Sequence, residues 1–154
     1  MKVHLSSDKP FDLAVDVLAV AVPSNFAKSE IFTQLDKLFG GELTKIAARE
    51  QWKARLDSSL VVHTLGKIKA PVLLLVGVGD KETLAEDRAL VAAAVRRATA
   101  LHAKSLAVLV KDIGKEAGAA GTRAEAVSIA ARLAAYRFDT YRTKDKKEGL
   151  KAVE

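Results

Sequence analysis

The chain has 154 residues, of which 49% are hydrophobic and 29% are charged, so it can bury a single core and lacks the composition of a disordered protein. It carries 25 Lys and Arg residues against 19 Asp and Glu, and the resulting net charge of +6 permits attraction to polyanions without requiring it. The lack of cysteine excludes disulfides, thiolate zinc sites and a cysteine nucleophile, and it suits a reducing cytoplasm. No apolar run reaches the roughly 18 residues of a membrane helix. We therefore expect a cytoplasmic protein with no membrane partner.

The first third of the sequence predicts two strands followed by two helices. Val3 to Leu5 alternates with polar neighbours, as a short strand does, and Leu13 to Val22 is an almost continuous apolar run typical of a strand covered on both faces. Apolar residues then recur at helical spacing from Ile31 to Phe39, and Gly40-Gly41 predicts the end of that helix. Leu43, Ile46 and Ala47 continue a second short helix towards Trp52.

The middle of the sequence predicts a pair of strands and a long helix. Leu60 to Leu65 is rich in β-branched residues, and Pro71 to Val78 is the strongest strand pattern in the chain. Thr83 and Glu86 have the spacing of a capping box, in which each side chain accepts a hydrogen bond from a free N–H of the first turn. We therefore expect a long helix from here to Leu101.

The last third predicts a strand over Lys104 to Val110, a small-faced helix from about Thr122 to Tyr136, and a last short strand over Leu150 to Val153. Strands that alternate with helices of this length favour an α/β fold, a three-layer α/β/α domain around a mixed, mostly parallel sheet. The sequence shows no internal repeat and no second domain.

One glycine pattern is a candidate phosphate site. Gly77 and Gly79 come between a strand and a helix, where backbone N–H groups can cradle a phosphate, but Glu82 stands where a dinucleotide fingerprint requires a third glycine. A tight strand-to-helix turn is the favoured interpretation. Gly66-Lys67 and Gly114-Lys115 lack the other residues of a P-loop and are rejected.

The titratable residues form no motif of metal binding or catalysis. His4, His63 and His102 have no histidine three to five residues away, so we expect His102 to lie at a helix C-terminus and the other two beside strands. The acidic residues are scattered around a strand start and a helix N-terminus: Asp12, Asp16, Glu82, Glu86 and Asp87. Trp52 is interpreted as a partly buried core or interface residue rather than a stacking platform for a ligand. The sequence thus predicts no catalytic, cofactor-binding or metal residue.

A basic strip lies between Arg137 and Lys151. It holds six basic and three acidic residues and so carries +3 of the net charge of +6. Clustered Lys and Arg can bind nucleic acid, but the interleaved acids and the lack of glycine-aromatic RNA motifs favour a solvated connector.

Three segments resemble the leucyl aminopeptidase family, the cytosol aminopeptidases of peptidase family M17. "YRFDTYRTKDKK", from Tyr136 to Lys147, is similar to the junction between the N-terminal and catalytic domains of that family. "SSLVVHTLGKIKAPVLLLVGVGDKETL" resembles its paired strands with the following G-x-G-x-K turn, and "HAKSLAVLV" resembles its next strand. The resemblance covers nearly the whole chain, in order and spacing.

The resemblance implies a macro-domain-like N-terminal domain at 1–136 and a basic junction with a last short strand at 137–154, leading to a catalytic domain that this chain lacks. The parent enzymes remove N-terminal residues, leucine among them, from peptides, by means of two divalent metal ions, zinc or manganese. The ligands lie around an N-T-D-A-E-G-R signature that is absent here, so no catalytic or metal residue is carried over. The implied role is assembly of a homo-hexamer with sibling subunits and access to its active sites, and the peptide substrate is met only through the parent.

Two alternative functions are kept open. A free-standing macro-like module would bind ADP-ribose or a related nucleotide, because "DVLAVAVPSNF", Asp16 to Phe26, resembles the aspartate, strand and asparagine loop of macro domains. The glycine-rich phosphate loop that should follow is replaced by the amphipathic helix at Lys28 to Phe39, whose interior N–H groups are already used. A DNA-binding accessory domain would instead show affinity that falls steeply with salt.

Overall fold

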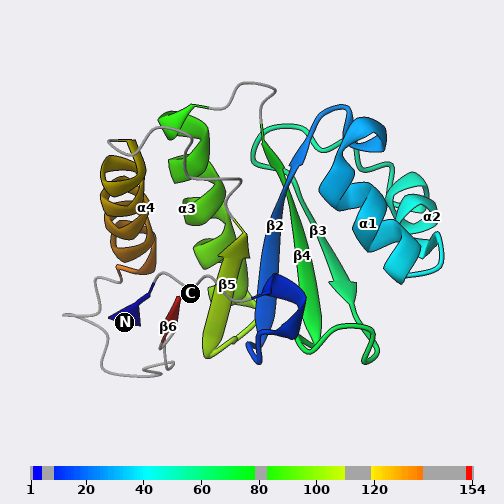
Figure 1. Ribbon diagram of the computed structural model, residues 1–154, viewed down its shortest axis with the longest axis horizontal. Helices are drawn as coiled ribbons and strands as arrows, with labels where there is room; N and C mark the ends of the chain where they lie inside the picture. The colour runs from blue at the N-terminus through cyan, green and yellow to red at the C-terminus, as the bar shows by residue number, and fades with distance from the viewer. Residues whose placement is uncertain (1, 5–8, 79–82, 110–118, 137–151, 154) are drawn as a thin grey trace.

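The computed structural model describes residues 2–4, 9–78, 83–109, 119–136 and 152–153 (Figure 1). The strands are β1 (Lys2–Val3), β2 (Val17–Pro23), β3 (Ser59–His63), β4 (Val72–Val78), β5 (Ser105–Leu109) and β6 (Ala152–Val153). The helices are α1 (Glu30–Leu38), α2 (Glu42–Arg49), α3 (Leu84–Ala100) and α4 (Ala119–Ala135), with two short 3-10 helices, η1 (Pro10–Asp12) and η2 (Phe26–Lys28).

The strands form one sheet in the order β1-β6-β5-β2-β4-β3. Every neighbouring pair in the described sheet is parallel except β3 and β4, which are antiparallel. The longest pairing joins β2 to β4 over the full length of both strands, from Val17 opposite Val72 to Pro23 opposite Val78. The predicted fold, a three-layer α/β/α domain with a mixed and mostly parallel sheet, is therefore confirmed.

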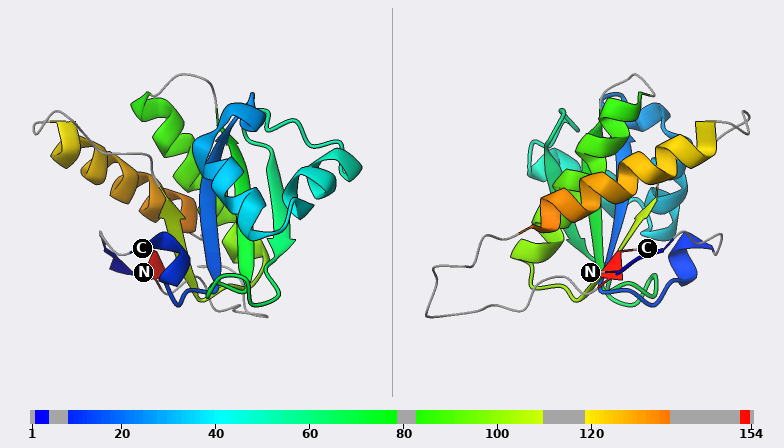
Figure 2. Two further views of the ribbon diagram at one scale, coloured as in Figure 1. Left: turned by 45° about the vertical axis from the view of Figure 1, so that its right-hand side comes forward. Right: turned by 90° about the vertical axis from the view of Figure 1, so that its left-hand side faces the viewer.

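The two central strands send alternate side chains to opposite faces of the sheet, because successive residues of a strand point in opposite directions. Leu18 and Val20 of β2, with Leu73 of β4, face the layer that contains α1 and α2. Val17 and Ala19 face α3 and α4 on the other side. Both faces are covered, which explains why these strands read as continuous apolar runs in the sequence. Figure 2 shows α4 crossing the outside of α3.

Three helices end with the same hydrogen-bond arrangement, the Schellman motif, which needs a residue at positive φ just after the helix. After α1 that residue is Gly40, at φ +70°, and Gly41 N donates to Asp36 O at 2.7 Å. The predicted stop at Gly40-Gly41 is confirmed. After α2 and α3 the positive-φ residues are Gln51 and His102, at φ 51° and 57°. His102 does lie at a helix C-terminus, as predicted.

Strand β2 begins at Val17, four residues later than the predicted start at Leu13. The reason is Asp16, whose carboxylate Oδ2 accepts hydrogen bonds from Lys104 N at 2.7 Å and Ser105 N at 3.0 Å. The Asp16 N–H in turn donates to Ser105 Oγ at 2.9 Å. These bonds anchor the start of β5 to the start of β2. Leu13 packs against the core without belonging to a strand.

The other predicted elements are present with small shifts at their ends. The capping box of α3 is confirmed, since Thr83 Oγ1 accepts from Glu86 N at 3.3 Å and Glu86 Oε2 accepts from Thr83 N at 3.2 Å. The predicted terminal strands are found as β1 and β6, while Leu5 and Leu150 lie outside the described residues. Among the helices that the structure describes, none is long and apolar enough to span a membrane.

Candidate functional site

The carboxyl ends of β2 and β4 form the edge where open α/β sheets bind ligands. Here a loop, residues 50–58, lies against the end of β4. The Gly77 N–H donates to Ser58 O at 2.8 Å, and a Cβ at position 77 would lie 2.6 Å from the Ala54 carbonyl carbon and 2.7 Å from its oxygen. A glycine is therefore needed at position 77 because the backbone of the loop lies against this point of β4. The sequence alone instead suggests that Gly77 belongs to a tight turn after the strand.

Trp52 is placed in this loop by the C-terminal cap of α2. The Trp52 N–H donates to Ala47 O at 2.9 Å, and the preceding Gln51 N–H donates to Ala48 O at 3.1 Å, which completes the Schellman motif. The indole packs against the core and lies 5.8 Å, between ring centroids, from Phe26. Phe26 in turn meets Phe32 edge-on at 4.9 Å. The prediction that Trp52 is a partly buried core residue is confirmed.

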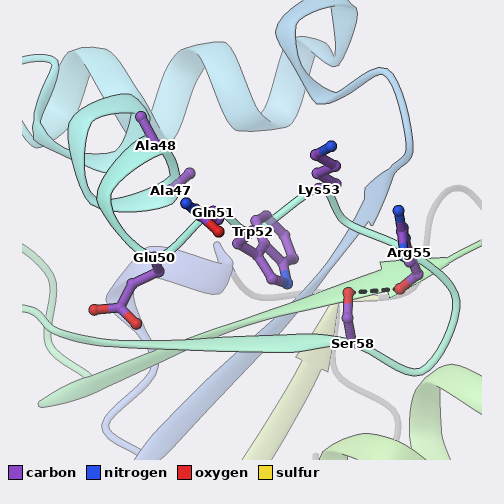
Figure 3. Close-up of a pocket in the computed structure, with 8 residues that line it drawn as sticks. All are labelled: Ala47, Ala48, Glu50, Gln51, Trp52, Lys53, Arg55 and Ser58. Atoms are coloured by element: carbon purple, nitrogen blue, oxygen red, sulfur yellow. Dashed lines mark hydrogen bonds between the residues drawn. The ribbon is translucent and has the colours of Figure 1, made fainter.

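A hollow of ≈ 780 Å³ opens beside Trp52 (Figure 3). Its lining comes from the end of α2 and from the loop: Ala47, Ala48, Glu50, Gln51, Trp52, Lys53, Arg55 and Ser58. Lys53 and Arg55 are exposed, and Ser58 Oγ donates to Arg55 O at 2.6 Å instead of to a base. The lining supplies no pair of side chains arranged for nucleophilic or acid–base catalysis.

The Trp52 indole N–H is buried and has no hydrogen-bond partner in the described part of the chain. A buried donor without a partner costs about 1–3 kcal/mol. Three non-glycine residues of the same loop also have positive φ: Gln51 at 51°, Ala54 at 47° and Asp57 at 62°. The packing of the loop on β4 and on the core therefore stabilises these positive φ angles and the unpaired N–H, which are unfavourable by themselves.

A second hollow of ≈ 600 Å³, here called the α3–α4 groove, lies between the outer surfaces of these helices. It is lined by Arg88, Ala89, Ala92 and Arg96 of α3 and by Ala126, Ile129, Ala130, Leu133 and Ala134 of α4. Sequence reasoning missed it, because it counted the apolar residues of the last helix as one inward face. The available signal was the spacing of Ile129, Leu133 and Tyr136, which adds a second apolar stripe.

The predicted positions of the other two histidines are confirmed. His4 directly follows β1 and His63 ends β3, and both side chains are exposed, like that of His102. No group of three or more His, Asp or Glu residues that could hold a metal ion occurs among the residues described. Gly66, at φ +82°, lies in the connection between β3 and β4, whereas Gly79, Glu82 and Gly114-Lys115 lie outside the described residues.

The acidic residues serve local structure where they are described. Asp12 is exposed in η1, Asp16 binds the backbone of β5, and Glu86 completes the cap of α3. Elsewhere, on α2, the hydrogen bond from Lys45 to Glu42 at 2.8 Å, and then the charge of Glu42, raise the pKa of Lys45 above its usual value.

The segment that resembles a macro domain, Asp16 to Phe26, ends in a cluster of aromatic side chains. Asp16 lies at the amino end of β2, whereas Asn25 and Phe26 follow its carboxyl end, so the strand separates them. Phe26 packs against both Trp52 and Phe32. The short helix η2 (Phe26–Lys28) then leads to the buried Ser29, the N-cap of α1, whose Oγ accepts from Phe32 N at 3.4 Å. An ordinary helix cap thus stands where a phosphate loop would be needed.

Residues 17–145 match the family model described as the cytosol aminopeptidase family, N-terminal domain. The chain belongs to this family. A relative from Geobacter sp. (strain M21), named "Probable cytosol aminopeptidase", is 32% identical over 153 residues, which is 96% of this chain and 30% of the relative. The chain thus spans about 30% of the length of the curated relative and corresponds to its N-terminal domain.

Solved structures show the same fold. A tomato leucine aminopeptidase mutant matches 99% of this chain and 32% of its own, with a TM-score of 0.83 and 20% identity. The bottromycin maturation enzyme BotP, in a structure with Mn, matches 91% of this chain and 26% of its own, with a TM-score of 0.61 and 26% identity. The macrodomain of Mycobacterium tuberculosis DarG matches 99% of this chain and 95% of its own, with a TM-score of 0.64 and 17% identity. The fold is therefore macrodomain-like, as predicted.

Proposed function

We propose that this chain is the non-catalytic N-terminal domain of a two-metal leucyl aminopeptidase, in which it contributes to assembly and to access to the active sites. The observation that carries the proposal is the match of residues 17–145 to the N-terminal domain of the cytosol aminopeptidase family. In this proposal residues 1–136 form the domain, and 137–154 form a connector, tied to the sheet by β6, that leads to the catalytic domain.

The chemistry in this proposal takes place in the catalytic domain, where two zinc or manganese ions would activate water for the removal of N-terminal residues from peptides. The Mn in the BotP structure, from a protein 26% identical to this chain, supports a metal-dependent parent. The partners of the domain would be that catalytic domain and the sibling subunits of a cytoplasmic homo-hexamer. The domain would position and gate, and would make no bonds itself.

A fusion protein tests this function. The chain would be joined at Glu154 to the part of the Geobacter relative that follows its own N-terminal domain. We expect the fusion to assemble and to hydrolyse leucyl p-nitroanilide with Mn²⁺ or Zn²⁺, and the isolated chain to show no hydrolysis above the blank. The Geobacter remainder without any N-terminal domain should either fail to assemble or hydrolyse the substrate at least about tenfold more slowly than the fusion. Hydrolysis by the isolated chain, or full assembly and activity of the remainder alone, would contradict the proposal.

Nucleotide binding remains the alternative from another class, and calorimetry with ADP-ribose tests it. We expect no binding tighter than about 1 mM, because Phe26 and the Ser29 cap occupy the region where a phosphate loop would lie. Micromolar binding would make the macro-like module the better assignment. The DNA-binding alternative depends on residues 137–151, which lie outside the described residues, and stays a prediction.

A further inference from the structure

Helix α4 is apolar on two sides, and only one of them is covered. Its inner side packs mainly on α3, where Ala131 is fully buried. On its outer side Ile129 and Leu133 are 50% and 71% exposed, and Tyr136, the residue after its end, is 72% exposed. These three residues are spaced four and three apart, so they form one stripe along the helix. An exposed apolar stripe of this kind on a helix whose other side is already packed marks a surface that another surface covers.

The opposite wall of the α3–α4 groove is positively charged. Arg88 and Arg96 are eight residues apart on α3, which places their Cα atoms ~12 Å apart along one side of the helix. Both side chains are exposed, no carboxylate lines the groove, and neither arginine has an ion pair in the described part of the chain. The floor between the walls consists of alanines, which let a partner approach closely. The surface therefore fits an apolar segment that carries carboxylates on one edge.

The polypeptide of the relatives continues after a strand that lies near the C-terminal end of α4. Figures 1 and 2 show β6 near the C-terminal end of α4. Val153 of β6 belongs to the same core cluster as Ala131 of α4, and Ala134 packs against that cluster. Since this chain matches only 30% of the Geobacter relative, and matches the N-terminal domain, most of that protein follows the position of β6. In such a relative the next domain is thus joined to the N-terminal domain near the end of α4 at which the stripe also ends.

From these observations we propose that the α3–α4 groove is the docking surface for the catalytic domain, which covers Ile129 and Leu133 with an apolar segment and pairs carboxylates with Arg88 and Arg96. The proposal rests on the proposed function and names the contact that function needs. The docked segment fixes how the N-terminal domain is held against the catalytic domain.

Two substitutions in the fusion protein test the docking surface, with amide hydrogen exchange of α4 as the readout. In the unsubstituted fusion the α4 amides should exchange at least about tenfold more slowly than in the isolated chain, because docking must be undone before they open. Leu133→Asp, and the double substitution Arg88→Glu with Arg96→Glu, should return the exchange of α4 to the rate of the isolated chain.

Matched controls separate docking from folding. Leu65→Asp changes a leucine that is 90% exposed at φ 50°, a geometry that aspartate tolerates, and Arg97→Glu changes the exposed neighbour of Arg96 that does not line the groove. Both should leave the slow exchange of α4 in the fusion intact. In the isolated chain all four variants should keep the thermal midpoint within about 4 °C of the parent, since every changed side chain is exposed.

Each outcome decides the proposal. An assembled, active fusion whose α4 exchanges as fast as in the isolated chain overturns the docking surface and leaves the proposed function standing. Sedimentation that shows the isolated chain to be a dimer, dissociated by Leu133→Asp, assigns the groove to a second copy and overturns the proposal as well. A fusion that neither assembles nor hydrolyses leucyl p-nitroanilide contradicts the proposed function and the docking proposal together.

Discussion

Replacement of Gly77 by alanine is expected to destabilise the protein by about 3 kcal/mol. The added Cβ would overlap the carbonyl oxygen of Arg55 and lie 2.6 Å from the carbonyl carbon of Ala54. Both are backbone atoms, so relief requires the loop to move away from β4, and this would also strain the hydrogen bond from Gly77 N to Ser58 O. In a chain of this size the loss corresponds to a fall of about 6 to 12 °C in the thermal midpoint, measurable by calorimetry.

Gly66→Ala is the matched control for this prediction. Gly66 has φ +82° and nothing within 4 Å of an added Cβ, so its substitution meets only the backbone strain of a left-handed residue, about 1 kcal/mol. If Gly77→Ala proved as mild as Gly66→Ala, the loop would not lie against the end of β4 as described.

Trp52→Ala is expected to cost about 3 kcal/mol, whereas Trp52→Phe should stay within about 1 kcal/mol of the parent. The alanine variant loses the packing of the ring on the core and on Phe26. The phenylalanine variant keeps most of that packing and removes the buried N–H that has no partner in the described residues, which offsets the lost area. Trp52 is the one tryptophan of the chain, so both substitutions remove the tryptophan fluorescence. Thermal unfolding is therefore followed by circular dichroism.

Trp52→Phe distinguishes a role of the indole N–H from a role of the packed ring. A loss as large as that of Trp52→Ala would mean that the indole N–H makes an important hydrogen bond, and the loop would then be a polar site. A small loss would mean that Trp52 acts through the packing of its ring on the core and on Phe26, and not through its N–H.

The sequence-based predictions succeeded where a local signal and the tertiary structure agree. The helix stop at Gly40-Gly41 and the capping box at Thr83 depend on residue types that have few other uses, and both are present. The helix ends at Gln51 and His102 use the same motif with residues that carry no such signal, so they could not be identified as left-handed positions.

The errors arose where distant segments decide the local structure. The apolar run from Leu13 predicted a strand, but Asp16 binds backbone N–H groups almost ninety positions away in β5, and no pattern within the run reports that pairing. Gly77 was interpreted through the motif around it, although its requirement comes from the backbone of Ala54 and Arg55. The second apolar stripe of α4 was in the sequence, but its exposure depends on which side α3 covers.

The place of β6 in the sheet has a consequence for synthesis on the ribosome. In the described sheet β1 pairs only with β6, and Lys2 lies opposite Ala152, so β1 cannot pair until β6, about 150 positions later, has been made. Until then the edge of β5 that later binds β6 presents free backbone groups, while β2 and β4 can already pair. Such long-range closure is slow, and the nascent domain therefore keeps an open sheet edge, of the kind that aggregates, until residues 152–153 have emerged.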